Sequence, residues 1–413
     1  MARNWRRVLM AGCVFGVTAI AAAPAMAIDE EHYRKGRELI EKAIGYLRTQ
    51  QDAETGGWSV NPEGPQFPAI TGLVINGMVM EPRIDMRDES VRRGVAFMLK
   101  YRQPDGGIYD RVLPSYNTAI CVSALSRVSA KEAGEAVEAA VPFLKSLQWG
   151  EDAGSGAAEG ADVSGTVGPE HPYYGGVGYG KSGRPDNSNL NLMLQALHDA
   201  GVSCDDPAFQ RALVFLSRTQ MLDEVNDMPY ADGSKQGGFI YATSLDRQQV
   251  GSGESKTNMI EETLDDGTKV SRLRAYGSMT YAGFKSYVYA NLSRDDPRVQ
   301  AAYGWIRANY TLEENPGIGR EGYYYYLLMF SRALDAWGLP QIEVAPRSGE
   351  GGVVPATNAE GMEVRDWAND LVDRLAELQE PDGSFRVLDK RWMEDNKVLI
   401  TAYALLALQH AVE

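Results

Sequence analysis

The chain repeats one pattern six times: an apolar segment of helical length runs into a turn rich in glutamine and glycine, and a second, more apolar segment follows. The clearest copies are 43–58, 95–109 and 371–385. Weaker copies end at Gln148 and at Gln220, and one more copy, which has lost the glutamine, lies around 305–319. A repeat of this kind constrains the architecture before any single residue is interpreted, because each unit must bury its apolar face against its neighbours.

Each unit is predicted to be a pair of helices. In the first unit Leu39, Ala43, Tyr46 and Leu47 follow the spacing of one helical face, which is typical of an amphipathic outer helix. The second segments are apolar nearly all round, as in helices buried on all sides. These segments are 69–79, 118–128, 190–197, 280–292, 323–337 and 398–412.

We therefore predict an all-α fold, an (α/α)6 toroid in which an inner ring of apolar helices is wrapped by an outer ring. An open solenoid of helix pairs is the alternative, but closure removes its exposed ends. The glycines after each outer helix are expected to form left-handed C-terminal caps. The acidic pairs before Pro207 and Pro297 are interpreted as N-caps.

The first 27 residues have the features of a secretory signal peptide. They contain a basic start with Arg3, Arg6 and Arg7, an apolar run, and an Ala-Met-Ala cleavage site at 25–27. We expect export to the periplasm or the extracellular space, with no integral membrane span after the signal is removed.

The rest of the chain, 28–413, is predicted to be a single toroid domain with long loops near 150–183 and 223–277. Loops of this length often serve as lids or binding segments. The formal net charge of −15 argues against nucleic acid as a partner. We expect no cofactor and no metal, because no spacing typical of such a site stands out.

Several stretches carry a family resemblance. The repeat resembles the glutamine–tryptophan motif of the prenyltransferase and squalene-cyclase (terpene cyclase) toroids, and the resemblance covers nearly the whole mature chain. YGGVGYGKSGRPDNSN at 174–189, GSMTYAG at 277–283, NPGIGREGYYYY at 315–326 and RWMEDNKVLITAYALLAL at 391–408 resemble an exported bacterial subgroup of unassigned reaction. The resemblance implies the fold; function is decided by the site.

The catalytic motifs of that family are missing from this sequence. It has neither the D-x-D-D motif that the resemblance implies for alkene protonation nor the D-D-x-x-D motif for metal-dependent ionisation of a diphosphate. No D-x-C accompanies Cys121, so the zinc ligands of protein prenyltransferases are absent as well.

The candidate site residues are the polar and aromatic residues at the starts of the inner helices, where a toroid opens its cavity. The candidate catalytic residues are Asp186, Tyr281 and Glu321. An N-cap role is the competing interpretation for Asp186. The candidate substrate-binding residues are Tyr116, Asn117, Asn187, Asn189, Tyr276, Ser278, Tyr323, Tyr324 and Trp392.

Three functions remain open at this stage. The first is an enzyme acting on an isoprenoid or other hydrophobic small molecule, which needs one buried acid with a raised pKa among Asp186, Glu321, Glu394 and Asp395. The second is a carbohydrate-active lyase or hydrolase, which needs two facing carboxylates or a Tyr–His pair such as Tyr281 with the loop histidine His171. The third is a noncatalytic binding or scaffold toroid with a protein partner.

Overall fold

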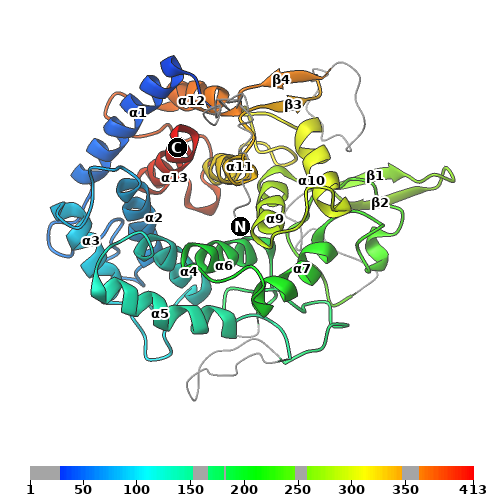
Figure 1. Ribbon diagram of the computed structural model, residues 1–413, viewed down its shortest axis with the longest axis horizontal. Coiled ribbons are helices and arrows are strands. Elements are labelled where there is room, and N and C mark those ends of the chain that lie inside the picture. Colours follow the sequence, from blue (N-terminus) through cyan, green and yellow to red (C-terminus); the bar gives the residue numbers. More distant parts are fainter. Residues whose placement is uncertain (1–27, 152–165, 181–182, 247–257, 347–361) are drawn as a thin grey trace, which may run out of the picture.

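The computed structural model describes residues 28–151, 166–180, 183–246, 258–346 and 362–413, and the predicted signal peptide lies outside them. Within these residues the helices form two concentric rings (Figure 1). The inner ring is built from α2 (Pro68–Val79), α4 (Pro114–Leu125), α6 (Asn187–Asp199), α9 (Gly277–Tyr289), α11 (Tyr323–Trp337) and α13 (Lys397–Val412). The outer ring is built from α1 (Glu30–Thr49), α3 (Glu89–Leu99), α5 (Lys131–Ser146), α7 (Pro207–Thr219), α10 (Pro297–Ala308) and α12 (Trp367–Leu378).

The inner ring is closed. Each inner helix packs against the next one in chain order, and the last, α13, packs against the first, α2. In the outer ring α12 likewise packs against α1. The predicted all-α (α/α)6 toroid is therefore confirmed, and the open solenoid is excluded because the first and last units touch.

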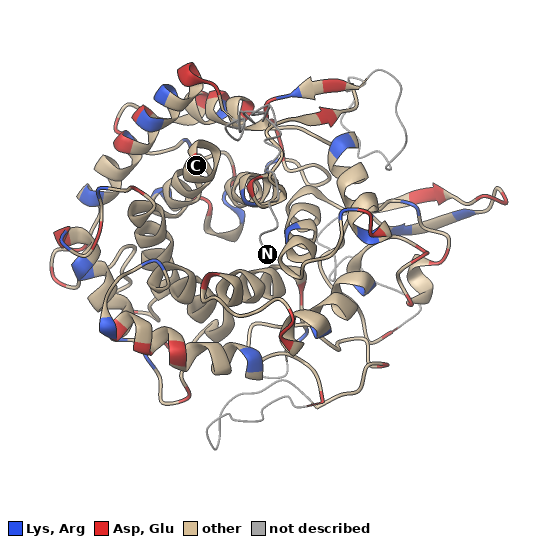
Figure 2. Ribbon diagram, viewed as in Figure 1, with Lys and Arg blue, Asp and Glu red and all other residues tan. Residues whose placement is uncertain are grey.

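Burial distinguishes the two rings as the apolar patterns predicted. Every residue of α2 from Pro68 to Met78 is buried, whereas α1 buries a single face that includes Leu39, Ala43 and Leu47. Figure 2 shows most of the charged residues on the outer helices and loops, while the inner ring is largely uncharged. Among the described helices, none is both long and apolar enough to cross a bilayer.

Helix starts are set by capping residues. Asp206 and Asp296 each accept a hydrogen bond from a first-turn amide of α7 and α10, which confirms their interpretation as N-caps. The inner helix predicted at 118–128 begins earlier, at Pro114, because proline is favoured in the first turn, where its missing N–H is not needed.

The repeated glutamine joins neighbouring units. The Nε2 of Gln148 donates to the carbonyls of Gly175, in the following turn, and Ala208, in the next outer helix, both at 2.9 Å. Gln51 and Gln220 make the same pair of bonds in their units. In the last unit Gln379 reaches the Leu39 carbonyl of α1 at 2.9 Å, so the motif also closes the ring.

The glycine of each turn allows a close backbone approach. Gly175 and Gly383 have φ of +81° and +87°. A Cβ on either residue would lie 1.9 or 2.2 Å from the carbonyl oxygen of Arg211 or Lys42 in the adjoining outer helix. The prediction that these glycines are C-caps is wrong, since α12 ends at Leu378, several residues before its glycine. They serve instead to let the turn lie against the next unit.

In the described parts of the chain two short antiparallel strand pairs interrupt the helical pattern, and the sequence analysis missed both. Strand β1 (Met259–Thr263) pairs with β2 (Lys269–Leu273) within the long loop 223–277, with Met259 opposite Leu273. Strand β3 (Ile342–Val344) pairs with β4 (Glu363–Arg365) between α11 and α12. The alternation of exposed and less exposed residues in β1 and β3 is too short to stand out beside the helical repeat, and β4 is exposed at all three positions.

Candidate functional site

The inner ring encloses a cavity at the end where its six helices begin. Its volume is about 460 Å³, within the usual range for small-molecule sites. The first turns of α2, α4, α6, α9, α11 and α13 all contribute to the lining, together with loop residues. The aromatic lining residues are Phe67, Tyr116, Tyr179, Tyr241, Tyr276, Tyr325, Trp392 and Tyr403. The wall is therefore suited to an apolar or flat ligand.

Three of the lining tyrosines are in direct contact. The hydroxyls of Tyr179 and Tyr241 lie 2.8 Å apart, and the ring of Tyr116 stacks on Tyr179 with centroids 5.3 Å apart. Burial raises the pKa of Tyr116, Tyr241 and Tyr276, so these phenols are neutral hydrogen-bond donors at neutral pH.

One carboxyl faces this wall. Among the described residues that line the cavity, Glu394 is the single acid, and it is only 2% exposed. Burial raises its pKa to about 7, although backbone amides of Tyr325 and Tyr324 donate to it at 2.9 and 3.2 Å and act in the opposite direction. Because those amides belong to the start of α11, the helix dipole stabilises the carboxylate whenever the proton leaves.

Backbone strain is concentrated at the same place. Leu113, Trp392 and Met393 all line the cavity, and their φ angles are +50°, +53° and +67°. They are three of the six non-glycine residues with positive φ in the described chain. Left-handed backbone is costly for residues with a side chain, and such residues cluster at ligand-binding and catalytic positions. Gly322, with φ +59°, packs against the indole of Trp392. A Cβ at position 322 would lie 2.7 Å from the Cε3 atom of that indole.

Asp186 lies outside this lining, behind it. Its carboxylate caps α6, accepting from the amides of Ser188 and Asn189, both at 2.9 Å, and from the Asn189 side chain at 2.8 Å. Burial raises its pKa, and these hydrogen bonds oppose the shift. The Ser188 hydroxyl and Tyr241 separate it from the cavity. Its geometry is that of the N-cap.

Five of the predicted substrate-binding residues line the cavity, namely Tyr116, Asn117, Tyr276, Ser278 and Trp392. Two others are occupied elsewhere. The side chain of Asn187 donates to the Ile240 carbonyl, and that of Asn189 bonds to Asp186 and Ser115.

The structure corrects the prediction that Tyr323 and Tyr324, at the start of α11, face the cavity. Tyr325 lines the cavity, whereas the hydroxyls of Tyr323 and Tyr324 donate outward to the carbonyls of Leu312 and Arg386. Successive helical residues turn by about 100°, so neighbours in the run cannot share one direction.

Two predicted catalytic residues are also placed away from the cavity. Glu321 forms an ion pair with Arg391 at 2.5 Å and remains about one-third exposed, so it is not the buried acid that was expected. Tyr281 is buried between the rings of Tyr326 and Phe330. The loop histidine His171 stacks on Trp149 instead, so the Tyr281–His171 pair of the carbohydrate hypothesis is not formed.

Sequence reasoning missed part of the wall. Tyr179 and Tyr241 come from loops, and Tyr403 lies well inside α13. The signal for Tyr403 was available, because it follows Leu399, another lining residue, by one helical turn. Tyr179 and Tyr241 lie in loops, where no periodic pattern indicates which way a side chain points.

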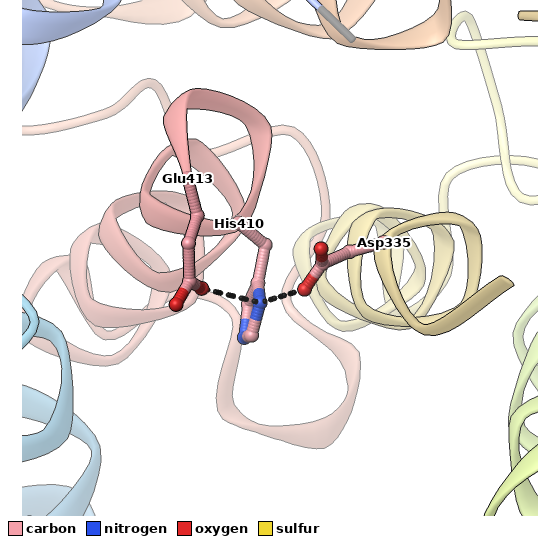
Figure 3. Close-up of side chains that lie close together, drawn as sticks. All are labelled: Asp335, His410 and Glu413. Atoms are coloured by element: carbon pink, nitrogen blue, oxygen red, sulfur yellow. Dashed lines mark hydrogen bonds and ion pairs between the residues drawn. The ribbon is translucent and has the colours of Figure 1, made fainter. Parts of the chain in front are cut away.

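At the opposite end of the ring, His410 of α13 lies between Asp335 of α11 and Glu413 (Figure 3). Its Nδ1 is 2.7 Å from Asp335 Oδ2 and 3.8 Å from Glu413 Oε2, and the ligand atoms of the three lie within 4.8 Å of one another, close enough for a metal ion. Burial lowers the pKa of His410. We interpret the group as a hydrogen-bonded bridge between α11 and α13.

Comparison with known proteins places the fold and leaves the reaction open. No protein family and no curated protein sequence matches the chain. Among solved structures, an unsaturated glucuronyl hydrolase specific for heparin is 12% identical over 92% of this chain and 97% of its own, with a TM-score of 0.52. The type II terpene cyclase MstE from Scytonema is 13% identical over 92% and 98%, with a TM-score of 0.46. At 12% identity the likeness to the hydrolase concerns the fold alone. The toroid implied by the repeat motif is the fold of this chain, as the closed packing of its helices shows.

Proposed function

We propose that the protein is an acid–base enzyme whose substrate is an apolar small molecule, such as an isoprenoid, held in the tyrosine-lined cavity. The observation that carries the proposal is Glu394, a buried carboxyl with a pKa of about 7 and the single acid in the described lining of this largely aromatic cavity. An acid with this pKa is partly protonated at neutral pH, which suits a proton donor.

The surroundings of Glu394 support a role as proton donor. A buried carboxyl delivers its proton to the substrate and becomes a carboxylate, which the α11 amides at 2.9 and 3.2 Å then stabilise. The rings of Tyr276, Tyr325 and Trp392 line the same cavity, and their faces attract positive charge that develops on a substrate.

The carbohydrate-active alternative is less well supported. Glycosidases usually use two carboxyls across the scissile bond. In the described lining Glu394 stands alone, since Asp186 is engaged at the start of α6 behind Tyr241. A shared fold with a glucuronyl hydrolase does not supply the missing acid. Location outside the cytoplasm stays a prediction from the first 27 residues.

The test compares two ligand classes on the wild type and on Glu394→Gln. Farnesol and an unsaturated glucuronyl disaccharide are each titrated by calorimetry, and their consumption is followed by mass spectrometry. We expect farnesol to bind both proteins and to be converted by the wild type alone. Asp395→Asn, which changes an exposed neighbouring acid, is the control and should keep the activity.

Two outcomes would contradict the proposal. Cleavage of the disaccharide without farnesol binding would indicate a carbohydrate-active enzyme. Binding of farnesol with no conversion by either protein would indicate a binding protein and remove Glu394 from catalysis.

A further inference from the structure

A layer of polar side chains lies below the cavity, on the same faces of the inner helices. Lys285 follows the lining residue Ser278 by seven residues in α9, and Arg332 follows Tyr325 by seven in α11. Seven residues are two helical turns, so both side chains point toward the ring axis about 10 Å further along it. They approach the end of the ring where the inner helices finish.

Lys285 is completely buried, and its ammonium group has no ion pair among the described residues. Its Nζ donates to Gln195 Oε1 at 2.5 Å and lies 5.2 Å from the centre of the Tyr289 ring. Burial lowers its pKa, and the positive charge of Arg332 lowers it further, while Asp199 acts in the opposite direction. The two cations and Asp199 therefore lie near one another.

Arg332 is 4% exposed, and its Nε has no hydrogen-bond partner. The ion pairs of the described residues do not include Arg332, whose pKa burial lowers, although the charge of Asp199 acts to raise it. The other buried arginines of the described chain are treated differently. Arg218 binds Asp227 and two backbone carbonyls. The Nε of Arg272, like that of Arg332, has no hydrogen-bond partner, but Arg272 forms an ion pair with Glu262 at 3.1 Å and donates to the Asp232 carbonyl. An unpaired buried guanidinium is unfavourable, so the contrast indicates an acceptor that the chain does not supply.

The acidic residues at this end of the ring do not supply the acceptor that the Arg332 Nε lacks. Asp335 is engaged by His410 (Figure 3), and the carboxylate of Asp199 accepts from Gln195 Nε2 at 2.9 Å. The C-terminal ends of the inner helices carry partial negative charge that favours cations in general, but this field offers no acceptor to the Arg332 Nε.

We propose that Lys285 and Arg332 form a second binding site, for a small oxyanion, at the end of the ring opposite the tyrosine-lined cavity. The shared chemistry is a phosphate or carboxylate group, whose oxygens match the guanidinium fork and the ammonium.

The experiment measures thermal unfolding of the wild type in inorganic phosphate, in acetate and in chloride at equal ionic strength. We expect phosphate or acetate to raise Tm in a saturable manner that chloride does not reproduce. The anion that raises Tm at the lower concentration identifies the ligand class. Equal Tm values in all three salts would overturn the proposal without any variant.

Arg332→Met and the matched control Arg218→Met distinguish a ligand site from a structural arginine. Arg332→Met should lose the anion response, with binding weakened about tenfold or more, and should be at least as stable as the wild type without anion. Arg218→Met should lower Tm and keep the response, because it breaks the pair with Asp227. An unchanged anion response in Arg332→Met would refute the site. If Arg332→Met does not fold, Lys285→Met is tested in its place.

Discussion

Replacing Glu394 by glutamine should remove a specific part of the pH dependence of stability. In the unfolded chain this carboxyl titrates near its ordinary value of 4.5, whereas in the folded protein burial raises its pKa to about 7. Between these values the unfolded state loses the proton and the folded state keeps it. The free energy of unfolding therefore falls as pH rises through this window, by about 3 kcal/mol in total.

The assay is urea unfolding of the wild type and Glu394→Gln at several pH values from 4.5 to 8. The variant has its own cost, because an amide nitrogen replaces one oxygen that faces the α11 amides, but that cost is the same at every pH. The difference in unfolding free energy should move in favour of the variant by about 3 kcal/mol between pH 4.5 and pH 8. Contributions from other titrating groups cancel in this difference.

Asp395→Asn is the control, since Asp395 is exposed and adjacent to Glu394 in the chain. Its difference from the wild type should stay nearly constant with pH. A constant difference for Glu394→Gln as well would refute the reasoning, because it would mean that Glu394 titrates alike in the folded and unfolded states.

Further predictions concern the framework. Trp58→Ala should destabilise by about 3–5 kcal/mol in urea unfolding, because the indole is 1% exposed; an unchanged midpoint would remove its packing role. Gln220→Ala removes the bonds to the Gly237 and Arg298 carbonyls and the acceptor of the buried Tyr287 hydroxyl, and should cost about 2 kcal/mol by the same assay; a neutral result would mean that the repeated glutamine does not join units. Gly322→Ala should cost about 1–2 kcal/mol and shift Trp392 fluorescence, and an unshifted spectrum would contradict the contact. Asp186→Ala should lower stability by about 1–2 kcal/mol through loss of the α6 cap; full stability with lost activity would restore Asp186 as a catalytic residue.

The sequence by itself determined the ring. A repeat of helix pairs with one amphipathic and one fully apolar helix can bury its surface only by stacking, and six such units close on themselves. The inner helix at 323–337 was predicted with its observed bounds, and the N-cap interpretation of Asp206 and Asp296 was confirmed. These features depend on residues a few positions apart, which is why local pattern was enough.

Only the tertiary structure decided the candidate site. Glu394 was one of four acids that the sequence could not separate, and its raised pKa depends on burial beside α11, far from it in the chain. Glu321 looked equivalent until its ion pair with Arg391 was seen. Likewise, a loop places Tyr241 in the wall, and helix rotation places Tyr325 there instead of Tyr324. Which polar group is desolvated, and by which neighbours, is a property of contacts between distant segments, and no periodicity in the chain encodes it.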